Sequence, residues 1–365
     1  MSTPTVLFKP EHCPRTDCHY HRYPLGWRWQ RWGFYSRDAA PRRIQRFRCG
    51  HCLHTFSRQT FDPTYWLKRP GFLREGFQRL VACSCFRQIA RGLGCSHTTL
   101  MRQCSRLARH ALLYLRQHAP QGPLAEHVVL DGFEGYAYSQ YHPCYLNLVV
   151  GSVSHYVHAF TESELRRKGS MTAAQRRRRA RIEHRVGRPD PKAIEKDSEA
   201  ALRIAVPEPQ HVVVHSDDHH AYPRALNRMV GWSFTHHVTA SKQARTAHNP
   251  LFPVNRLDLL TRHSSANHKR ETIAFSKSRQ GVIDRAAILM LWLNFVKPFS
   301  ERRGGGTPAM RLGLRQRPET VTTLLGERLF PSRVALPAPW QDYYWRAVPT
   351  RELARGRPHT LKLAT

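Results

Sequence analysis

HVVLD at residues 127–131 and HVVVHSDD at residues 211–218 are the two stretches that decide the fold of this chain. Each is a short aliphatic run of the kind that forms a buried strand, and each ends in aspartate. Acids that directly follow two buried strands can meet at a shared sheet edge, where carboxylates can hold divalent cations. Asp131, with Asp217 or Asp218, is therefore a candidate site for Mg²⁺ or Mn²⁺, which support two-metal cleavage of phosphodiesters. For either acid alone, a helix-capping role is the alternative.

Further strands and helices are expected around these two stretches. Runs rich in β-branched and aromatic residues predict strands at 145–150 and 156–160. A helix is expected from Pro191 to about residue 204, with the proline at its start. The apolar stretch 282–296 predicts a buried helix that stops before a proline. These elements predict an α/β domain over residues 121–299.

A very basic stretch, residues 165–188, lies inside this domain, and we treat about 165–190 as an insertion. Its Ala, Gln, Arg and Glu content favours a helix, which the breaker GRPDP at 187–191 ends. A run of arginines without interleaved acids predicts a clamp along DNA phosphates, with a solvated basic helix as the alternative. The clamp residues would be Arg176, Arg177, Arg178 and Arg179.

The stretch FRQIARGLGCSHTTL, residues 86–100, has the pattern of a helix-turn-helix. Ala90 is small where two helices must approach, Gly94 occupies the turn, and Ser96 is a good N-cap for the second helix. We therefore predict a helix-turn-helix DNA-binding domain at 63–120, an ordinary helical hairpin being the alternative. Its second helix would present these residues to a major groove: Ser96, His97, Thr98, Arg102 and Gln103.

Two cysteine pairs predict a zinc ribbon at residues 1–62. Cys13 and Cys18 are separated by four residues, and Cys49 and Cys52 by two, so each pair has the spacing of a zinc knuckle. Unliganded cysteines in a loop-rich segment are the alternative. Nearby histidines could replace one thiol; they are His12, His19, His21, His51 and His54. Four protein ligands leave no open position, so this zinc would be structural.

The composition indicates a polyanionic partner. The 365 residues include 58 Lys and Arg against 26 Asp and Glu, a formal net charge of +32, and nucleic acid is the leading candidate. No segment approaches the roughly 18 apolar residues that a membrane span needs, and no membrane partner is expected. The start of the chain lacks a signal peptide, which predicts a cytoplasmic, nucleoid-associated protein. Residues 300–365 predict a disordered basic Gly/Pro-rich tail with a patch that contacts DNA or a partner.

The motifs together resemble those of the zinc-ribbon insertion-sequence transposases of the DDE superfamily. The resemblance extends from about Cys13 to Pro298. It is carried by RFRCGHCLHTFS at 46–57, VLDGFEGY at 129–136, HSDDHHAYPRAL at 215–226 and VNRLDLLTRHSSANHKRETIAFSKS at 254–278. It implies a ribonuclease-H-like mixed-sheet catalytic domain behind the ribbon and helix-turn-helix. It further implies structural Zn²⁺, catalytic Mg²⁺ or Mn²⁺, and a homo-oligomer that binds inverted-repeat ends and target DNA.

The resemblance also assigns the first two catalytic acids. Asp131 corresponds to the first acid of the family's Asp-Asp-Glu triad. Asp217 corresponds to the second, because the family places that acid five residues before a tyrosine, which is Tyr222 in this chain. Asp218 is the weaker choice. With these acids, the chain would bind element ends and catalyse strand cleavage and strand transfer.

The third position departs from the family pattern. Asn255 stands where the family has glutamate, and Glu271 and Asp258 are alternatives. Arg262, seven residues after Asn255, corresponds to a basic residue that grips DNA phosphate. Because asparagine brings no charge, a catalytically degenerate DNA-binding regulator is the alternative function. A ribonuclease-H-type nuclease acting in repair or RNA processing is a third.

Overall fold

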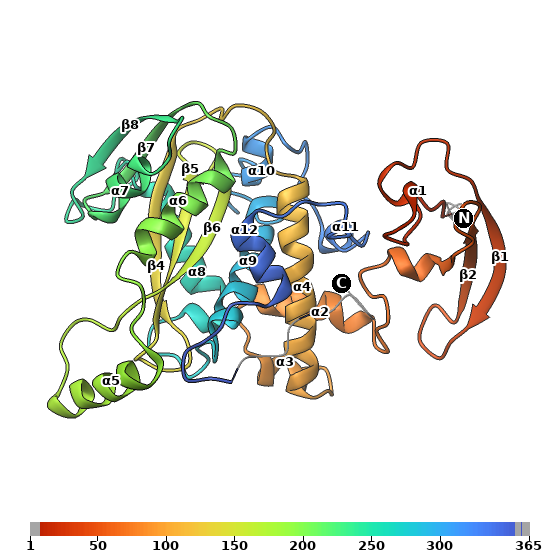
Figure 1. Ribbon diagram of the computed structural model, residues 1–365, viewed down its shortest axis with the longest axis horizontal. Helices are drawn as coiled ribbons and strands as arrows, with labels where there is room; N and C mark the ends of the chain where they lie inside the picture. Colours follow the sequence, from red (N-terminus) through yellow and green to blue (C-terminus); the bar gives the residue numbers. More distant parts are fainter. Residues whose placement is uncertain (1–7, 355–358, 360–365) are drawn as a thin grey trace.

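The computed structural model describes residues 8–354 and 359 of the chain. The described chain forms a small N-terminal unit and a larger α/β body, joined by the segment that follows residue 61 (Figure 1). Residues 1–7 of the predicted ribbon, and residues 355–358 and 360–365 of the predicted tail, lie outside the described residues.

The N-terminal unit is a three-stranded antiparallel sheet in the order β1-β2-β3. Its elements are α1 (His19–Arg22), β1 (Trp29–Ser36), β2 (Arg43–Cys49), β3 (Thr55–Ser57) and the 3₁₀ helix η1 (Arg58–Phe61). Phe47, Phe56 and Phe61 make a small aromatic core beside the cysteines. Phe330, far along the chain, completes this core, so the unit is packed against a C-terminal segment.

Three helices follow the ribbon. They are α2 (Gly71–Val81), α3 (Phe86–Gly92) and α4 (His97–Gln117). The predicted turn is present: Gly94 has a φ of 59°, which glycine adopts without a steric penalty, and Ser96 caps α4 by accepting a hydrogen bond from the Thr98 N–H. The rest of α4 packs along α9 (Arg279–Phe295), which is buried over nearly its whole length. The buried helix expected at 282–296 is thus present.

The α/β body is built on a five-stranded mixed sheet in the order β6-β5-β4-β7-β8. The strands are β4 (Val128–Tyr136), β5 (Pro143–Gly151), β6 (Val157–Glu164), β7 (His211–Asp217) and β8 (Ser233–Thr239). β4, β5 and β6 are antiparallel neighbours, whereas β4, β7 and β8 are parallel. The α/β prediction is confirmed. β8 was not predicted, because SFTHHVT is mostly polar, as suits a strand at the sheet edge.

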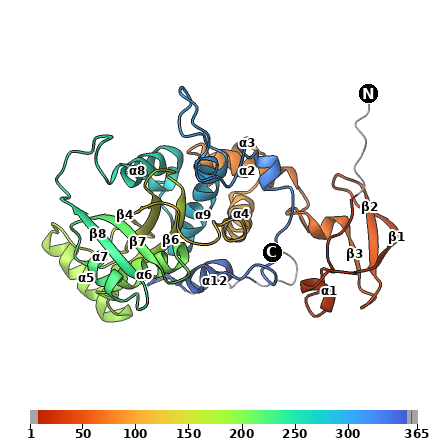
Figure 2. The ribbon, with the colours of Figure 1, turned by 90° about the horizontal axis from the view of Figure 1, so that it is seen from above.

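Helices lie on both sides of this sheet (Figure 2). α6 (Ala193–Ala205) packs on β5 and β6, and α7 (Ala221–Asn227) packs on α6. α8 (Phe252–Ser264) contacts β4 and β5 from the other side and is followed by the 3₁₀ helix η2 (Ala266–His268). α5 (Ala173–Val186) projects away from the body at the lower left of Figure 1.

The C-terminal region is folded against the body over the residues described, contrary to the expected disorder. It contains α10 (Pro308–Arg311), α11 (Val321–Leu324) and α12 (Ala338–Trp345). Trp340 is 2% exposed and donates a hydrogen bond of 2.9 Å from Nε1 to the Phe160 carbonyl of β6. The aromatic residues of WQDYYW therefore serve as core, which outweighs the Gly/Pro/Arg-rich composition around them. Among the described helices, none has both the length and the apolar character to cross a membrane.

Candidate metal centres and DNA-contacting surfaces

The four predicted zinc ligands converge. The Sγ atoms of Cys13, Cys18, Cys49 and Cys52, together the four-cysteine group, all lie within 4.8 Å of one another. The Sγ atoms of Cys13 and Cys52 are 3.6 Å apart, far longer than the roughly 2.05 Å of a disulfide. Four Zn–S bonds of about 2.3 Å in a tetrahedron bring the sulfurs to about this separation. The four-cysteine group can therefore hold a zinc ion.

The surroundings of the cysteines shift their thiols in opposite directions: burial raises the pKa of Cys13 and of Cys18, whereas the pKa of Cys49 is lowered. Burial alone would raise the pKa of Cys49, but N–H donors around its sulfur lower the pKa to about 7. Two of these donors are the Trp27 indole, at 3.2 Å, and the His51 backbone N–H, at 3.4 Å. The buried rings of His12 and His21 instead contact the Cys13 carbonyl oxygen through Nδ1, at 3.0 and 2.8 Å. These two histidines thus help to hold the backbone of Cys13, one of the four candidate zinc ligands, in place.

Asp131 and Asp217 lie at the same level on neighbouring parallel strands. The last paired residues of β4 and β7 are Leu130 and Ser216, and the two acids are the next residue on each strand. Because side chains alternate along a strand, Asp131 and Asp217 point to the same sheet face, with their strands about 4.8 Å apart. The two acids thus meet where the pairing of β4 with β7 stops, but the expectation that Asp131 ends its strand is wrong, because β4 continues to Tyr136 through its pairing with β5.

The carboxyl group of Asp131 lies in a polar but largely dehydrated pocket. Oδ1 accepts hydrogen bonds from the Gly132 N–H, at 2.7 Å, and from the Tyr222 hydroxyl, at 3.1 Å. Burial raises the pKa of Asp131 to about 6, the negative charge of Asp217 adds to the rise, and the two hydrogen bonds oppose it. A bound cation would stabilise the ionised form of a buried carboxyl group such as Asp131, because its positive charge offsets the negative charges of Asp131 and Asp217.

Asp258 on α8 is the third acid beside this pair. Burial raises its pKa to about 7, and the negative charge of Asp131 contributes to that rise. Its Oδ1 is buried and has no hydrogen-bond partner among the described residues. The positive charges of Arg262 and Arg245 oppose the rise in pKa, so both arginines lie near the acids. An orphaned carboxylate oxygen near the charge of Asp131 fits a cation ligand.

The other candidates for the third position lie differently. Asn255 is half-buried on α8, one turn before Asp258, so it shares a face of that helix. Glu271 is exposed on the turn between η2 and α9, with a φ of 50°. Asp218 is exposed and accepts a hydrogen bond of 3.4 Å from Ser241. α8 therefore carries Asn255 and Asp258 toward the sheet that bears Asp131.

The acid cluster is more open than the cysteine cluster. Among the described residues, the four-cysteine group is the one set of three or more His, Cys, Asp or Glu side chains whose ligand atoms all lie within 4.8 Å. Asp131, Asp217 and Asp258 are therefore more widely spaced.

Most of the predicted DNA-facing residues of the helix-turn-helix are exposed. Ser96, His97 and Thr98 at the start of α4, and Arg102 one turn later, all face solvent. Gln103 differs from the expectation, because it is 6% exposed and its Oε1 is buried without a described partner. Gln103 is therefore buried in the helical body and is not available to contact a groove.

The basic insertion forms α5, whose capping box joins Thr172 and Gln175. Within the helix only Ile182 is buried, so the element has almost no core of its own. Arg176, Arg177 and Arg178 are exposed, whereas Arg179 is half-buried and contacts Glu183 at 3.4 Å. Arg262, the other predicted phosphate contact, lies with its guanidinium 4.4 Å from the centre of the Phe133 ring.

Two features of the site were not predicted, and a third, Asp258, was predicted only as an alternative. Arg245 follows β8 in the loop before α8, and its charge lowers the pKa of both Asp131 and Asp258. Tyr145 hydrogen-bonds the Tyr222 hydroxyl at 2.8 Å and so extends the network around Asp131. The position of Asp258 near Asp131 became evident only from the fold. Its position three residues after Asn255, on the same helix face, is the signal that could have raised it.

Comparison with known proteins adds little to this description. No protein-family model matches the chain, and no curated protein sequence matches it. Among solved structures, it aligns with a chain from the cryo-EM structure of the simian T-cell lymphotropic virus intasome in complex with PP2A regulatory subunit B56 gamma. That alignment covers 68% of this chain and 74% of the other, at 14% sequence identity and a TM-score of 0.25. At that score the likeness establishes no shared fold.

Proposed function

We propose that this chain is a metal-dependent DNA transposase with a ribonuclease-H-like catalytic domain. The observation that carries the proposal is the placement of Asp131 and Asp217 side by side on parallel strands, with Asp258 of α8 close enough to act on Asp131. Mixed sheets with acids at this position suit cation binding, and the net charge of +32 suits a DNA substrate.

Each part of the chain has a place in this proposal. Asp131, Asp217 and either Asp258 or Asn255 would hold the Mg²⁺ or Mn²⁺ ions. Those ions supply activation of a water or 3′-hydroxyl and stabilisation of the leaving oxygen. Tyr222 orients the Asp131 carboxylate through its hydrogen bond. Cation binding would release the proton that Asp258 otherwise holds near neutral pH, because its pKa is about 7.

The DNA-contacting parts of the chain also belong to this proposal. The zinc ribbon and the exposed start of α4 would recognise the element ends, and α5 would follow phosphates along the bound duplex. Ser96, His97, Thr98 and Arg102 are the residues available for this contact on α4. We propose the predicted boundaries at 62, 120 and 299 as those of the ribbon, the helix-turn-helix and the catalytic domain. A homo-oligomer acting on paired ends completes the proposal.

A strand-cleavage assay on DNA that carries the element ends tests the catalytic assignment. We expect Asp131→Ala and Asp217→Ala to lose at least about 100-fold in rate, because each removes a metal ligand. The matched control is Asp218→Ala, which removes the exposed neighbouring acid and should leave the rate near wild type. Equal rates in all four proteins would overturn the assignment.

The same assay identifies the third ligand. Asp258→Asn and Asn255→Ala are compared over a range of Mn²⁺ concentrations, since loss of a ligand raises the metal requirement. We expect Asp258→Asn to need more metal, with Glu271→Gln close to wild type because Glu271 is exposed on its turn. If Asn255→Ala alone raises the metal requirement, the asparagine is the ligand.

A catalytically degenerate DNA-binding regulator is the second candidate. The observation in its favour is the neutral Asn255 where the resembling family has an acid. It predicts tight binding of end DNA with no metal-dependent cleavage by the wild-type protein. Short inverted repeats flanking the coding region would favour the transposase.

A further inference from the structure

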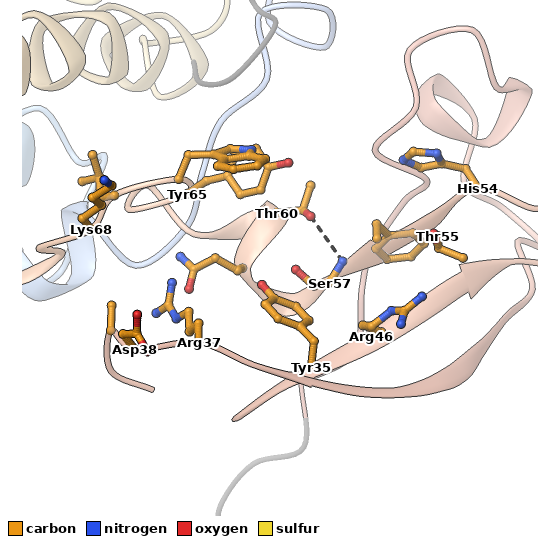
Figure 3. Close-up of a pocket in the computed structure, with 15 residues that line it drawn as sticks. Tyr35, Arg37, Asp38, Arg46, His54, Thr55, Ser57, Thr60, Tyr65 and Lys68 are labelled. Carbon is orange, nitrogen blue, oxygen red and sulfur yellow. Dashed lines mark hydrogen bonds between the residues drawn. The ribbon is translucent and has the colours of Figure 1, made fainter. Parts of the chain in front are cut away.

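A sizeable hollow of the described chain lies away from the acids, in the N-terminal unit. It has a volume of about 760 Å³ and lies between the ribbon sheet and the segment that links η1 to α2 (Figure 3). Figure 3 shows the Tyr35 side chain rising from β1 toward Ser57 and Thr60, with Tyr65 and Lys68 on the opposite wall. A cavity of this size can hold a small organic group such as a nucleotide.

Aromatic side chains from both walls line this hollow. Tyr35 and Trp66 are exposed in part, at 37% and 63% of their surface. Tyr65 is less available, because the guanidinium of Arg328 lies 4.8 Å from the centre of its ring. Trp66 has a φ of 63°, a backbone region that bulky residues rarely adopt. This backbone conformation costs conformational energy, and the exposed indole of Trp66 is not part of the aromatic core of the ribbon.

The charges around the hollow favour an anionic ligand. Arg37, Arg46 and Lys68 line it, against the single acid Asp38. Arg37 is fixed at the rim, because its guanidinium donates hydrogen bonds to the carbonyl oxygens of Ala40, at 2.6 Å, and Pro41, at 3.1 Å. Cationic side chains around aromatic faces are the arrangement that binds the phosphates and bases of single-stranded nucleic acid.

We propose that this hollow binds one unpaired nucleotide of single-stranded DNA. Within a duplex both faces of each base are covered by its neighbours, so an aromatic side chain can stack only on a base that has left the helix. Trp66 and Tyr35 would stack on the base, while Arg37 and Lys68 contact the flanking phosphates. The inference takes DNA as the ligand from the proposed function but does not depend on DNA cleavage.

Binding of a fluorescent ten-nucleotide oligothymidine to the full-length, zinc-loaded protein tests the proposal. Fluorescence anisotropy is measured without Mg²⁺ or Mn²⁺, in the Asp131→Asn background, so a failure of the catalytic proposal cannot affect the result. We expect Trp66→Leu to weaken binding about tenfold, as expected for loss of one base stack, and to leave binding to a duplex unchanged.

Trp32→Leu is the matched control. Trp32 is on the same ribbon and 40% exposed, but it lies under the guanidinium of Arg48, 4.5 Å from the ring centre, and does not line the hollow. This variant should bind the oligonucleotide like the parent protein. Equal losses in both variants, or a loss for duplex as large as for single strand, would overturn the proposal.

A second measurement needs no variant and covers the case that Trp66→Leu fails to fold. A ten-nucleotide strand made of abasic sites alone, and the same strand carrying one thymine at its centre, are each bound to the parent protein. Stacking of one base predicts an affinity about tenfold higher for the strand that carries the thymine. Equal affinity of the two strands would mean that only phosphates are bound, and the proposal would be wrong.

Discussion

The hydroxyl of Tyr222 donates a hydrogen bond of 3.1 Å to Oδ1 of Asp131. Asp131 is the last residue of the first stretch from which the fold was predicted, and Tyr222 lies just after the second stretch, five residues beyond Asp217. The turn into α7 therefore brings Tyr222 beside β4, where its hydrogen bond links the segment that follows Asp217 to Asp131. Gly132 leaves room for this arrangement, since a Cβ at that position would lie 1.9 Å from the ring of Tyr145, the partner of Tyr222.

Replacing Tyr222 by phenylalanine should shift the pH dependence of activity. The hydrogen bond lowers the pKa of Asp131, which burial has raised to about 6, so its loss should raise that pKa further. We expect the acidic limb of the pH–rate profile for end cleavage to move to higher pH. Tyr138→Phe, an exposed tyrosine, serves as the control. An unshifted profile would remove Tyr222 from its proposed role.

Asp131→Asn should stabilise the metal-free protein at alkaline pH. Burial raises the folded-state pKa of Asp131 to about 6, so the fold binds this proton more tightly than the unfolded chain does. The stability that the proton contributes is fully present below about pH 4 and is lost as the pH rises through about 6. At pH 8 the variant should exceed wild type by about 1–3 kcal/mol in free energy of unfolding, with little advantage near pH 4.

Urea denaturation at both pH values checks this prediction. Asp218→Asn is the control, since that acid is exposed and should show no such difference. Adding Mg²⁺ at pH 8 should raise the melting temperature of wild type and not that of Asp131→Asn, because only the former keeps the full ligand set. Identical pH dependence in wild type and Asp131→Asn would contradict the buried-acid interpretation.

Cys49→Ser should release zinc and unfold the ribbon while the α/β body stays folded. The ribbon has its own small aromatic core around the cysteines, separate from the large core of the sheet and helices. Without metal such a unit has too little buried apolar area to remain folded. Zinc content and limited proteolysis give the readout, with half-buried Cys95→Ser as the control. A ribbon that resists proteolysis without zinc would refute the structural role.

Replacing Arg177 and Arg178 together by glutamine should weaken DNA binding through the phosphate contacts alone. Both are exposed on α5. If both contact phosphates, the slope of log K against log salt should fall by about 2, with similar losses for end DNA and unrelated duplexes. The matched control replaces Arg302 and Arg303, two adjacent exposed arginines of the C-terminal region. An unchanged slope in the α5 variant would favour a solvated helix over a clamp.

Local patterns were enough to predict the elements on which the candidate site depends. The cysteine spacing located every member of the four-cysteine group, and the aliphatic runs located β4 and β7 with an acid at the end of each run. These signals are local because strand formation and knuckle formation depend on a few consecutive residues. Ser96 and Gly94 marked the helix-turn-helix in the same way.

Long-range packing accounts for what was missed. The polar strand β8 forms only because β7 offers it a partner, and the C-terminal aromatics are buried only because β6 and α9 leave a face for them. Gln103 was predicted to contact a DNA groove, but in the folded chain it is buried among the helices. No window of a few residues contains the neighbour that decides each case.

For the chain as a whole, spacing and alternation along the sequence were sufficient to place Asp131 and Asp217 on two strands and four thiols in two pairs, although Asp131 lies inside β4 and not at its end. Which side chains of α8 lie near the acids depends on the approach of α8 to β4, because a helix presents different residues as it turns about its axis. Because of that approach, Asp258, which is 127 positions after Asp131 in the sequence, lies close enough for the charge of Asp131 to raise its pKa.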